Sequence, residues 1–360
     1  MRHSFLSVDD LFEKFIGQPF MICFVIGLQS MQRRLIDEEQ LREILQLENV
    51  NQVMAYLKKT PGYEGYFSEI DENRVHREDM EKLLRQTVFL DFVKLYRFSD
   101  KEQKAFLELY AKKYDIYVLK AFFTRLFDPN QEQVIDVSLY RDFFSRHSRL
   151  DLDRLSSCTD EPSLLEALKG TEYYAPLKAV QGLDPLIFDD GMALDVYYFT
   201  QIWNIRKKLF SGTDLEELTV TYGEKFDLLN MQFIYRSKKY YNLPAAAIYS
   251  ILIPVNYKLS REDIQSMVEA ASAEEALQLF GHTWYGKKFN RHKDITLEEF
   301  YSINLQELLE REARRHPYSV AILFRYLYSK EQEVRRLTLA LEAVRYQMPP
   351  EEAMRYIQNT

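Results

Sequence analysis

Apolar residues recur at steps of three and four along much of this chain, the spacing that places side chains on one face of a helix. Around residues 35–67 such a stripe runs through two short segments and ends at a threonine followed by aromatic residues. The same stripe recurs when the sequence is shifted by 111 or by 223 residues. The positions that superpose are Leu41, Leu152 and Ile264; Ile44, Leu155 and Met267; Met54, Leu165 and Leu277; Leu57, Leu168 and Phe280; and Thr60, Thr171 and Thr283. Each unit is therefore predicted to be a pair of short helices that closes on a threonine-containing turn.

A second pattern recurs downstream, inside segments that are predicted to be long helices. An acidic residue precedes an aliphatic residue by four positions at Asp115, Asp227 and Glu333. Successive acids are 112 and 106 residues apart, close to the spacing of the first pattern. Two of the three predicted helices end at a proline-containing step, residues 243–244 and 348–350, because proline cannot continue a helix.

A period of about 110 residues is longer than the roughly 20 to 50 residues of a solenoid unit and matches the size of a small domain. We interpret it as three copies of one helical unit, with domains at residues 1–130, 131–245 and 246–360. Chance alignment of aliphatic stripes is the alternative, and the agreement between two separate patterns argues against it. Glycine and proline are scarce, at 11 residues each, which favours helices over sandwiches and barrels. The predicted fold is all-α.

Charge and cysteine content narrow the classes of function. The net charge is −8, so nucleic-acid binding through a basic field is not expected. Cys23 and Cys158 are the only cysteines and have no CxxC partner, which predicts reduced thiols in the cytoplasm without a disulfide framework or zinc site. The longest apolar run, residues 20–28, is about half the length of a membrane helix. Acidic residues precede it, so a signal peptide is not expected. If a protein with these features acts at a membrane, we expect it to bind a partner that is embedded there.

Several segments resemble ligand sites without completing them. Residues 281–288 approximate the phosphate loop GxxxxGK[ST], but Lys288 stands where a hydroxyl must hold magnesium, and Thr283 belongs to the repeat. Residues 71–82 begin like a calcium loop, but the sixth position is His76 and the twelfth is Lys82. The six histidines show no HExxH spacing. We predict no catalytic, cofactor-binding or metal-binding residue, no cofactor, and a protein that is not an enzyme.

The two ends of the chain resemble a known family. Residues 31–67, which read MQRRLIDEEQLREILQLENVNQVMAYLKKTPGYEGYF, are similar to the opening of the C subunit of V/A-type rotary ATPases and ATP synthases, the equivalent of the d subunit of eukaryotic V-ATPases. At the other end, YSKEQEVR at residues 328–335 and MPPEE at residues 348–352 are similar to the closing pattern of that family. Arg336 stands where the family usually has asparagine, and Gln347 lies near an expected glycine.

The resemblance implies a function and partners. It implies a non-catalytic rotor subunit shaped as a funnel with pseudo-threefold symmetry and a central cavity. Such a rotor part couples the central-stalk subunits to the membrane proteolipid ring, in ATP-linked transport of protons or sodium ions. It implies a peripheral location at the cytoplasmic face of the membrane, with indirect membrane contact, no nucleic acid and no small-molecule substrate. The alternative is a generic helical-repeat scaffold that binds partner helices in a cytosolic complex. A nucleotide enzyme or hydrolase would need a site that the sequence does not offer.

Overall fold

The computed structural model describes residues 22–71, 76–127, 141–181, 190–292 and 295–358. These residues form helices joined by turns and contain no strand, so the prediction of an all-α fold is confirmed. The chain divides into two compact units. The first comprises residues 1–103 and 309–360, and the second comprises residues 104–308. The predicted division into three domains stays a prediction, and its first boundary, at residues 130–131, lies outside the described residues.

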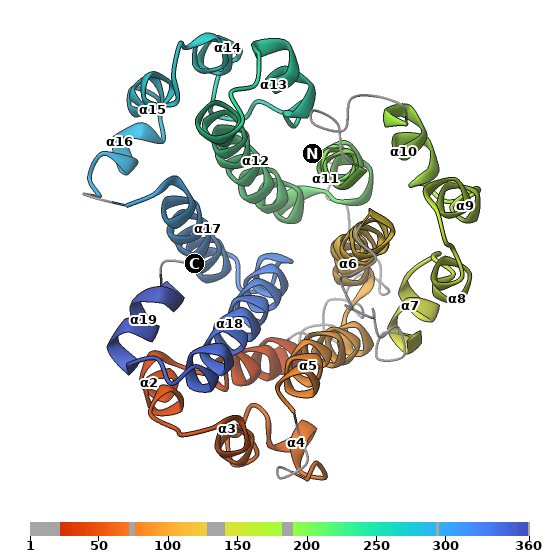
Figure 1. Cartoon of the computed structure of the whole chain (residues 1–360), viewed down its shortest axis with the longest axis vertical. Coiled ribbons are helices and arrows are strands. Elements are labelled where there is room, and N and C mark those ends of the chain that lie inside the picture. Colours follow the sequence, from red (N-terminus) through yellow and green to blue (C-terminus); the bar gives the residue numbers. More distant parts are fainter. Residues whose placement is uncertain (1–21, 72–75, 128–140, 182–189, 293–294, 359–360) are drawn as a thin grey trace, which may run out of the picture. The chain divides into compact units, whose positions relative to one another are not determined.

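Both ends of the sequence contribute to the first unit. Helix α18 (Ala321–Arg345) packs against α5 (Arg77–Phe98) and against α2 and α3, and α19 packs on α2 and α18. In Figure 1 the blue α18 accordingly lies beside the red and orange helices of the N-terminal part. The other helices of this unit are residues 22–33, α2 (Glu38–Leu45), α3 (Val50–Leu57), α4 (Glu64–Phe67), the start of α6 (Lys101–Phe127), the end of α17 (Leu297–Arg315) and α19 (Pro350–Gln358).

The second unit is organised around α12 (Gly212–Tyr240). This helix packs against α11, α13, α14 and α15, and its buried Leu228, Met231 and Ile234 join an apolar cluster with residues of α14 and α15. Helices of this unit besides α12 are most of α6 and α17, α7 (Arg141–His147), α8 (Leu152–Ser156), α9 (Glu161–Ala167), α10 (Tyr174–Val180), α11 (Asp190–Leu209), α13 (Ala245–Ile251), α14 (Arg261–Glu269), α15 (Ala273–Gly281) and α16 (Gly286–Phe289).

The paired short helices begin at side-chain caps. In each case an oxygen of the cap residue accepts a hydrogen bond from the backbone amide three residues later, which satisfies an otherwise unpaired donor of the first turn. The caps of the first helices (α2, α8, α14) are Asp37, Asp151 and Ser260, and those of the second helices (α3, α9, α15) are Asn49, Asp160 and Ser272.

The cap positions show how the three pairs of short helices align with one another in the sequence. The second-helix caps keep the offsets of 111 and 223 residues that the sequence predicted. In the first helices, Leu41 and Ile264 lie four residues after their caps, whereas Leu152 lies one residue after its cap. Leu155 therefore occupies the place of Leu41 and Ile264 in α8. All four side chains are buried, so a helix of five residues keeps its apolar face by moving the stripe three positions.

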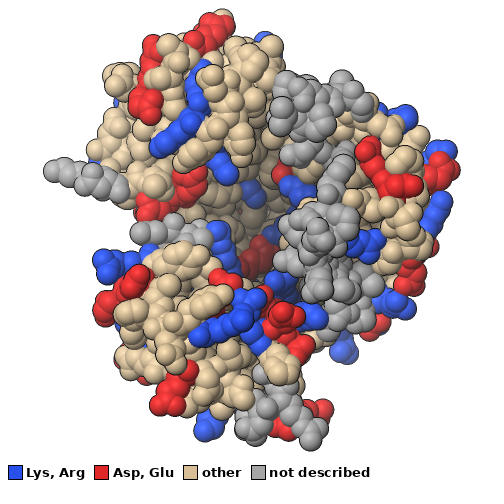
Figure 2. Space-filling view, in the orientation of Figure 1, with Lys and Arg blue, Asp and Glu red and all other residues tan. Residues whose placement is uncertain are grey.

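The surface carries both signs of charge. On the face drawn in Figure 2, acidic and basic side chains of the described residues are interspersed. Within the part of the chain that the structure describes, no helix combines the length and the apolar content that a bilayer crossing requires.

Candidate functional site

Three buried tyrosines each donate a hydrogen bond to one of the three acids that the sequence pattern singled out. The hydroxyl of Tyr173 lies 2.7 Å from Asp115 Oδ2, and that of Tyr285 lies 2.9 Å from Asp227 Oδ2. The hydroxyl of Tyr63 lies 2.7 Å from Glu333 Oε2. In the first two pairs the tyrosine follows its acid by 58 residues, whereas Tyr63 precedes Glu333 by 270 residues. We call these three pairs the tyrosine–carboxylate latches.

The threonine turns hold the tyrosines in place. The backbone amides of Thr60, Thr171 and Thr283 each donate to the carbonyl three residues earlier, at 2.9 to 3.0 Å. The hydroxyls of Thr171 and Thr283 donate to the same carbonyls, both at 2.7 Å, while the hydroxyl of Thr60 donates to the carbonyl of Tyr56 at 3.1 Å. Each threonine thus closes the second short helix and starts the turn that directs the tyrosine toward a long helix.

The threonine turn that begins at Thr60 has one residue more than those that begin at Thr171 and Thr283. Two residues separate Tyr63 from Thr60, namely Pro61 and Gly62, whereas one residue separates the threonine from the tyrosine in the second and third copies. A Cβ atom on Gly62 would lie 2.3 Å from the carbonyl oxygen of Arg34. The extra position is therefore restricted to glycine by close backbone approach rather than by its φ angle.

Glu333 is the latch acid that pairs with a buried lysine. Besides Tyr63, it accepts a hydrogen bond from the backbone amide of Ile36 at 2.5 Å and one from Lys330 Nζ at 2.7 Å. Lys330 also donates to the hydroxyl of Tyr63 at 3.0 Å. Lys330 and Glu333 are both buried, and a buried ion pair is costly unless further hydrogen bonds stabilise it. The donors Tyr63 and the amide of Ile36 supply those hydrogen bonds to Glu333. The network joins α18 to the start of α2 and to the turn before α4.

Asp227 is stabilised mainly by backbone donors. Its carboxylate accepts from the amides of Tyr257, Lys258 and Leu259 at 3.1, 2.6 and 3.0 Å. Leu259 and Ile36 are 223 residues apart, so the same backbone position contacts the latch acid in both copies. Burial raises the pKa of Asp227, and the backbone hydrogen bonds together with that of Tyr285 act in the opposite direction.

Asp115 is held chiefly by hydroxyl donors. Burial raises its pKa to about 6, against hydrogen bonds from Tyr173 and Ser148 that lower it. Lys112 lowers the pKa further through its charge, and Glu172 raises it. Lys112 and Glu172 also form an ion pair with each other, which weakens the help that Lys112 gives to Asp115. Asp115 is consequently the latch acid whose ionised form is least well supported by its surroundings.

The tyrosines themselves were not predicted from the sequence. The signal was present, because an aromatic residue follows the threonine in every copy, but aromatic residues also fill ordinary cores. Lys330 was missed as well, since a lysine one helical turn before a glutamate is ordinary on a helix surface. Burial raises the pKa of Tyr63, Tyr173 and Tyr285 well above the usual value, and their carboxylate partners raise it further. These hydroxyls are donors throughout the physiological pH range.

The segments that approximated ligand sites have structural explanations where the structure describes them. Residues 281–288 form the end of α15, the turn of Thr283 and the start of α16. A Cβ atom on Gly286 would lie 2.1 Å from the carbonyl oxygen of Phe280, so backbone rather than open space surrounds this glycine. The calcium-like segment includes residues 72–75, which lie outside the described residues.

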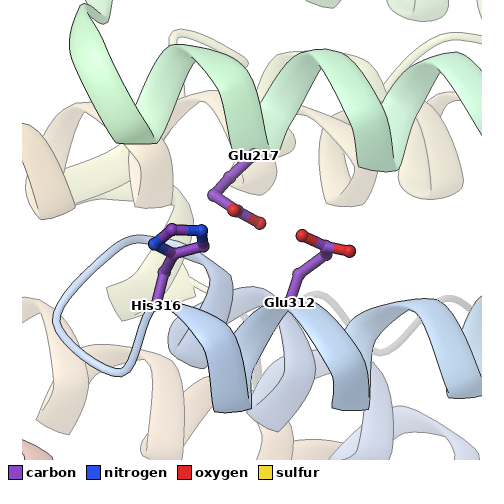
Figure 3. A group of neighbouring side chains, drawn as sticks. All are labelled: Glu217, Glu312 and His316. Carbon is purple, nitrogen blue, oxygen red and sulfur yellow. The ribbon is translucent and has the colours of Figure 1, made fainter.

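Figure 3 draws Glu217, Glu312 and His316. Glu312 and His316 lie one turn apart at the end of α17, where the amide of His316 donates to the carbonyl of Glu312 at 2.9 Å. Glu312 is buried and accepts a charged hydrogen bond from Arg311 Nε at 2.6 Å. Glu217 belongs to α12 in the other unit. We assign no metal site to residues that are divided between the two units.

Known proteins resemble this chain over most of its length. The model of the ATP synthase (C/AC39) subunit family matches residues 28–356. Among curated proteins, the C subunit of the A-type ATP synthase of Methanobrevibacter smithii is 23% identical over 335 residues, covering 89% of this chain and 83% of that protein. The corresponding C subunits of Pyrococcus furiosus and Thermococcus kodakarensis are each 23% identical, over 342 and 347 residues. These two alignments cover 90% and 92% of this chain, and 86% and 88% of the relatives.

Proposed function

Because the chain belongs to the ATP synthase (C/AC39) subunit family, we propose that it is the non-catalytic rotor subunit that couples the central stalk of a V/A-type rotary ATPase or ATP synthase to the membrane proteolipid ring. The observation that carries the proposal is the set of three tyrosine–carboxylate latches at related positions of the repeat. A rotor part must be rigid and must present similar surfaces around an axis. A tripled helical module with buried cross-links meets both requirements.

The latches suit a part that transmits torque. Each one fixes the end of a short helix to the side of a long helix by a buried, charge-assisted hydrogen bond, and such bonds are shorter and stronger than neutral ones. Shear between the two helices would break the bond and leave a buried carboxylate with fewer donors, which costs free energy. Close packing of the surrounding side chains adds resistance to the same movement. None of this requires covalent chemistry from the subunit.

The proposal includes the architecture and the partners. Three related domains would curl into a funnel with a central cavity that receives the stalk subunits, while the other face would rest on the proteolipid ring. The subunit would be peripheral at the cytoplasmic face, in contact with the membrane through the ring alone. Acidic and basic side chains interspersed on a surface favour polar, oriented contacts with partners.

Reconstitution of the cognate complex tests this function. We expect that complexes assembled without this subunit still hydrolyse ATP but no longer transport ions, and that adding the purified chain restores transport. Gel filtration of the chain with the central-stalk pair is expected to give one joint peak at micromolar concentration. Full ATP-driven transport without the subunit, or separate elution from the stalk pair, would contradict the proposal.

The scaffold alternative predicts a different outcome. A generic helical scaffold would bind isolated partner helices and would leave coupling unaffected when it is removed. The comparison of hydrolysis with transport therefore separates the two functions directly.

A further inference from the structure

A pocket of about 720 Å³ opens on the first unit, within the range of volumes that small-molecule sites occupy. The end of the helix at residues 22–33, the turn before α4 and α4 itself form one part of its wall, and α5 and α18 form the other. All of its lining residues belong to this unit. The latches and the coupling function give this pocket no role.

The two charged groups at the floor of the pocket, Asp91 and Lys330, already have hydrogen-bond partners. The buried Asp91 accepts hydrogen bonds from the hydroxyls of Tyr66 and Tyr326, the second at 2.6 Å. The buried Lys330 donates to Glu333 and to Tyr63. Glu333 thus balances the charge of Lys330, and two hydroxyl donors stabilise the carboxylate of Asp91.

The two cations at the mouth are in a different situation. Arg34 and Lys94 line the pocket and are exposed, and neither forms an ion pair or side-chain hydrogen bond with any residue that the structure describes. Glu64 also lies at the mouth and supplies one opposing charge. The side chains that line the pocket carry three positive and two negative charges, so the lining is net positive in a chain whose overall charge is −8. The two exposed cations at the mouth would attract an anion more than a cation.

The wall between floor and mouth is partly apolar. Met31, Leu35 and Pro61 contribute carbon surface on one side, and Leu90, which is 42% exposed, contributes it on α5. Leu90 and Lys94 are one helical turn apart, so an apolar contact and a cation face the same ligand. A ligand that buries an apolar body on this wall and directs an anionic group outward would use both features.

We propose that this pocket is a binding site for a small organic anion, with a carboxylate, phosphate or sulfonate group between Arg34 and Lys94 and an apolar body against Leu90 and Leu35. The ligand is bound and not transformed, because the floor groups Asp91 and Lys330 are already hydrogen-bonded to other residues of the protein. The inference goes beyond the proposed coupling function, which requires no ligand.

Titration of the full chain with anilinonaphthalene sulfonate tests the site, because this probe combines a sulfonate with an aromatic body and becomes fluorescent in apolar surroundings. We expect saturable binding to one site, displacement by phenyl phosphate, and no displacement by benzyl alcohol, which lacks the charge. The double variant Arg34→Gln, Lys94→Gln is expected to weaken binding about tenfold or more, the effect of losing two charged contacts.

Two further variants keep the test specific. Arg33→Gln removes the same charge one residue away from Arg34 but outside the pocket, and it should bind the probe like the parent protein. Gly65 lines the pocket, and a Cβ atom there meets nothing within 4 Å, so Gly65→Leu adds side-chain volume at the pocket wall and should weaken binding. Far-UV circular dichroism verifies that each variant is folded. Equal weakening by Arg33→Gln, or undiminished binding by Gly65→Leu, would overturn the proposal.

Discussion

The hydroxyl of Tyr63 and the carboxylate of Glu333 are 2.7 Å apart although 270 residues separate them in the sequence. The corresponding tyrosines of the other two copies each bond an acid only 58 residues before them. Helices α6 and α12 carry the acids that bond Tyr173 and Tyr285, the tyrosines that follow these helices in the sequence. Helix α18 carries the acid that bonds Tyr63, near the start of the chain. Within the first unit, this bond joins α18 to the turn that follows the first pair of short helices.

Removing the hydroxyl of Tyr63 is expected to destabilise the first unit. Tyr63→Phe deletes a buried donor to an ionised acceptor, so the free energy of unfolding should fall by about 1.5 to 3 kcal/mol in urea denaturation. Glu333→Ala should cost more, about 3 to 5 kcal/mol, because it leaves the buried Lys330 without its counter-charge.

Tyr56→Phe is the matched control for this prediction. The hydroxyl of Tyr56 also donates to a glutamate, Glu43, at 2.6 Å, but that bond is exposed. Its loss should change the free energy of unfolding by less than about 0.5 kcal/mol. Equal effects of Tyr56→Phe and Tyr63→Phe would mean that burial of the latch contributes nothing.

Asp115 predicts a pH dependence of stability. Its pKa is about 6 in the folded protein and 3.8 in the unfolded reference, so the folded state binds the proton more tightly between these values. The free energy of unfolding should therefore fall as pH rises from about 4 to 6, by roughly 3 kcal/mol from this group. Asp115→Asn keeps an oxygen that can accept from Tyr173 and removes the titration.

The measurement is a series of urea denaturations between pH 4 and 8 with parent and variant. Their difference in stability should change over this window and then become constant above pH 7, with Asp115→Asn at least as stable as the parent there. Parallel pH profiles for the two proteins would show that Asp115 does not titrate in this range.

Gly62, in the turn before α4, and Gly65, within α4, are expected to respond in opposite ways to substitution by alanine. Gly62→Ala places a methyl group against the carbonyl of Arg34, so the turn must shift. The free energy of unfolding, measured by thermal denaturation, should fall by about 1 to 3 kcal/mol. Gly65→Ala adds a methyl group in open space within α4, where alanine is the better helix former. It should leave stability unchanged or raise it by up to about 1 kcal/mol. A loss of similar size in both variants would argue against the close approach at Gly62.

Deleting residues 321–360 should unfold the N-terminal short helices selectively. The deletion removes α18, whose Glu333 bonds both Tyr63 and the backbone amide of Ile36. The backbone amides of α2 and α3 should therefore lose their protection from hydrogen exchange. Helices α14 and α15 pack on α12 within the second unit and should keep theirs. Deleting only residues 350–360 removes α19, leaves the latch intact and serves as the milder control. Persistent protection of α2 and α3 without α18 would contradict the role of the bond between Glu333 and Tyr63 in holding these helices.

The sequence alone determined the local elements and the positions of the latch acids. Apolar steps of three and four predicted the helices, and caps such as Asn49, Asp160 and Ser272 lie where those stripes begin. These features depend on the geometry of one helix and its first turn, so residues close in sequence suffice to specify them. For the same reason Asp115, Asp227 and Glu333 could be located as related positions without knowledge of their partners.

Only the tertiary structure decided which groups those acids contact. Packing of α18 beside α5 and α2 brings Glu333 to Tyr63, and no local pattern specifies a contact across 270 residues. The three-residue shift that places Leu155 instead of Leu152 in register with Leu41 was equally hidden, because either leucine continues an apolar stripe. Helical periodicity records which face of a helix is buried, whereas the choice of partner depends on how distant helices fill the same interior.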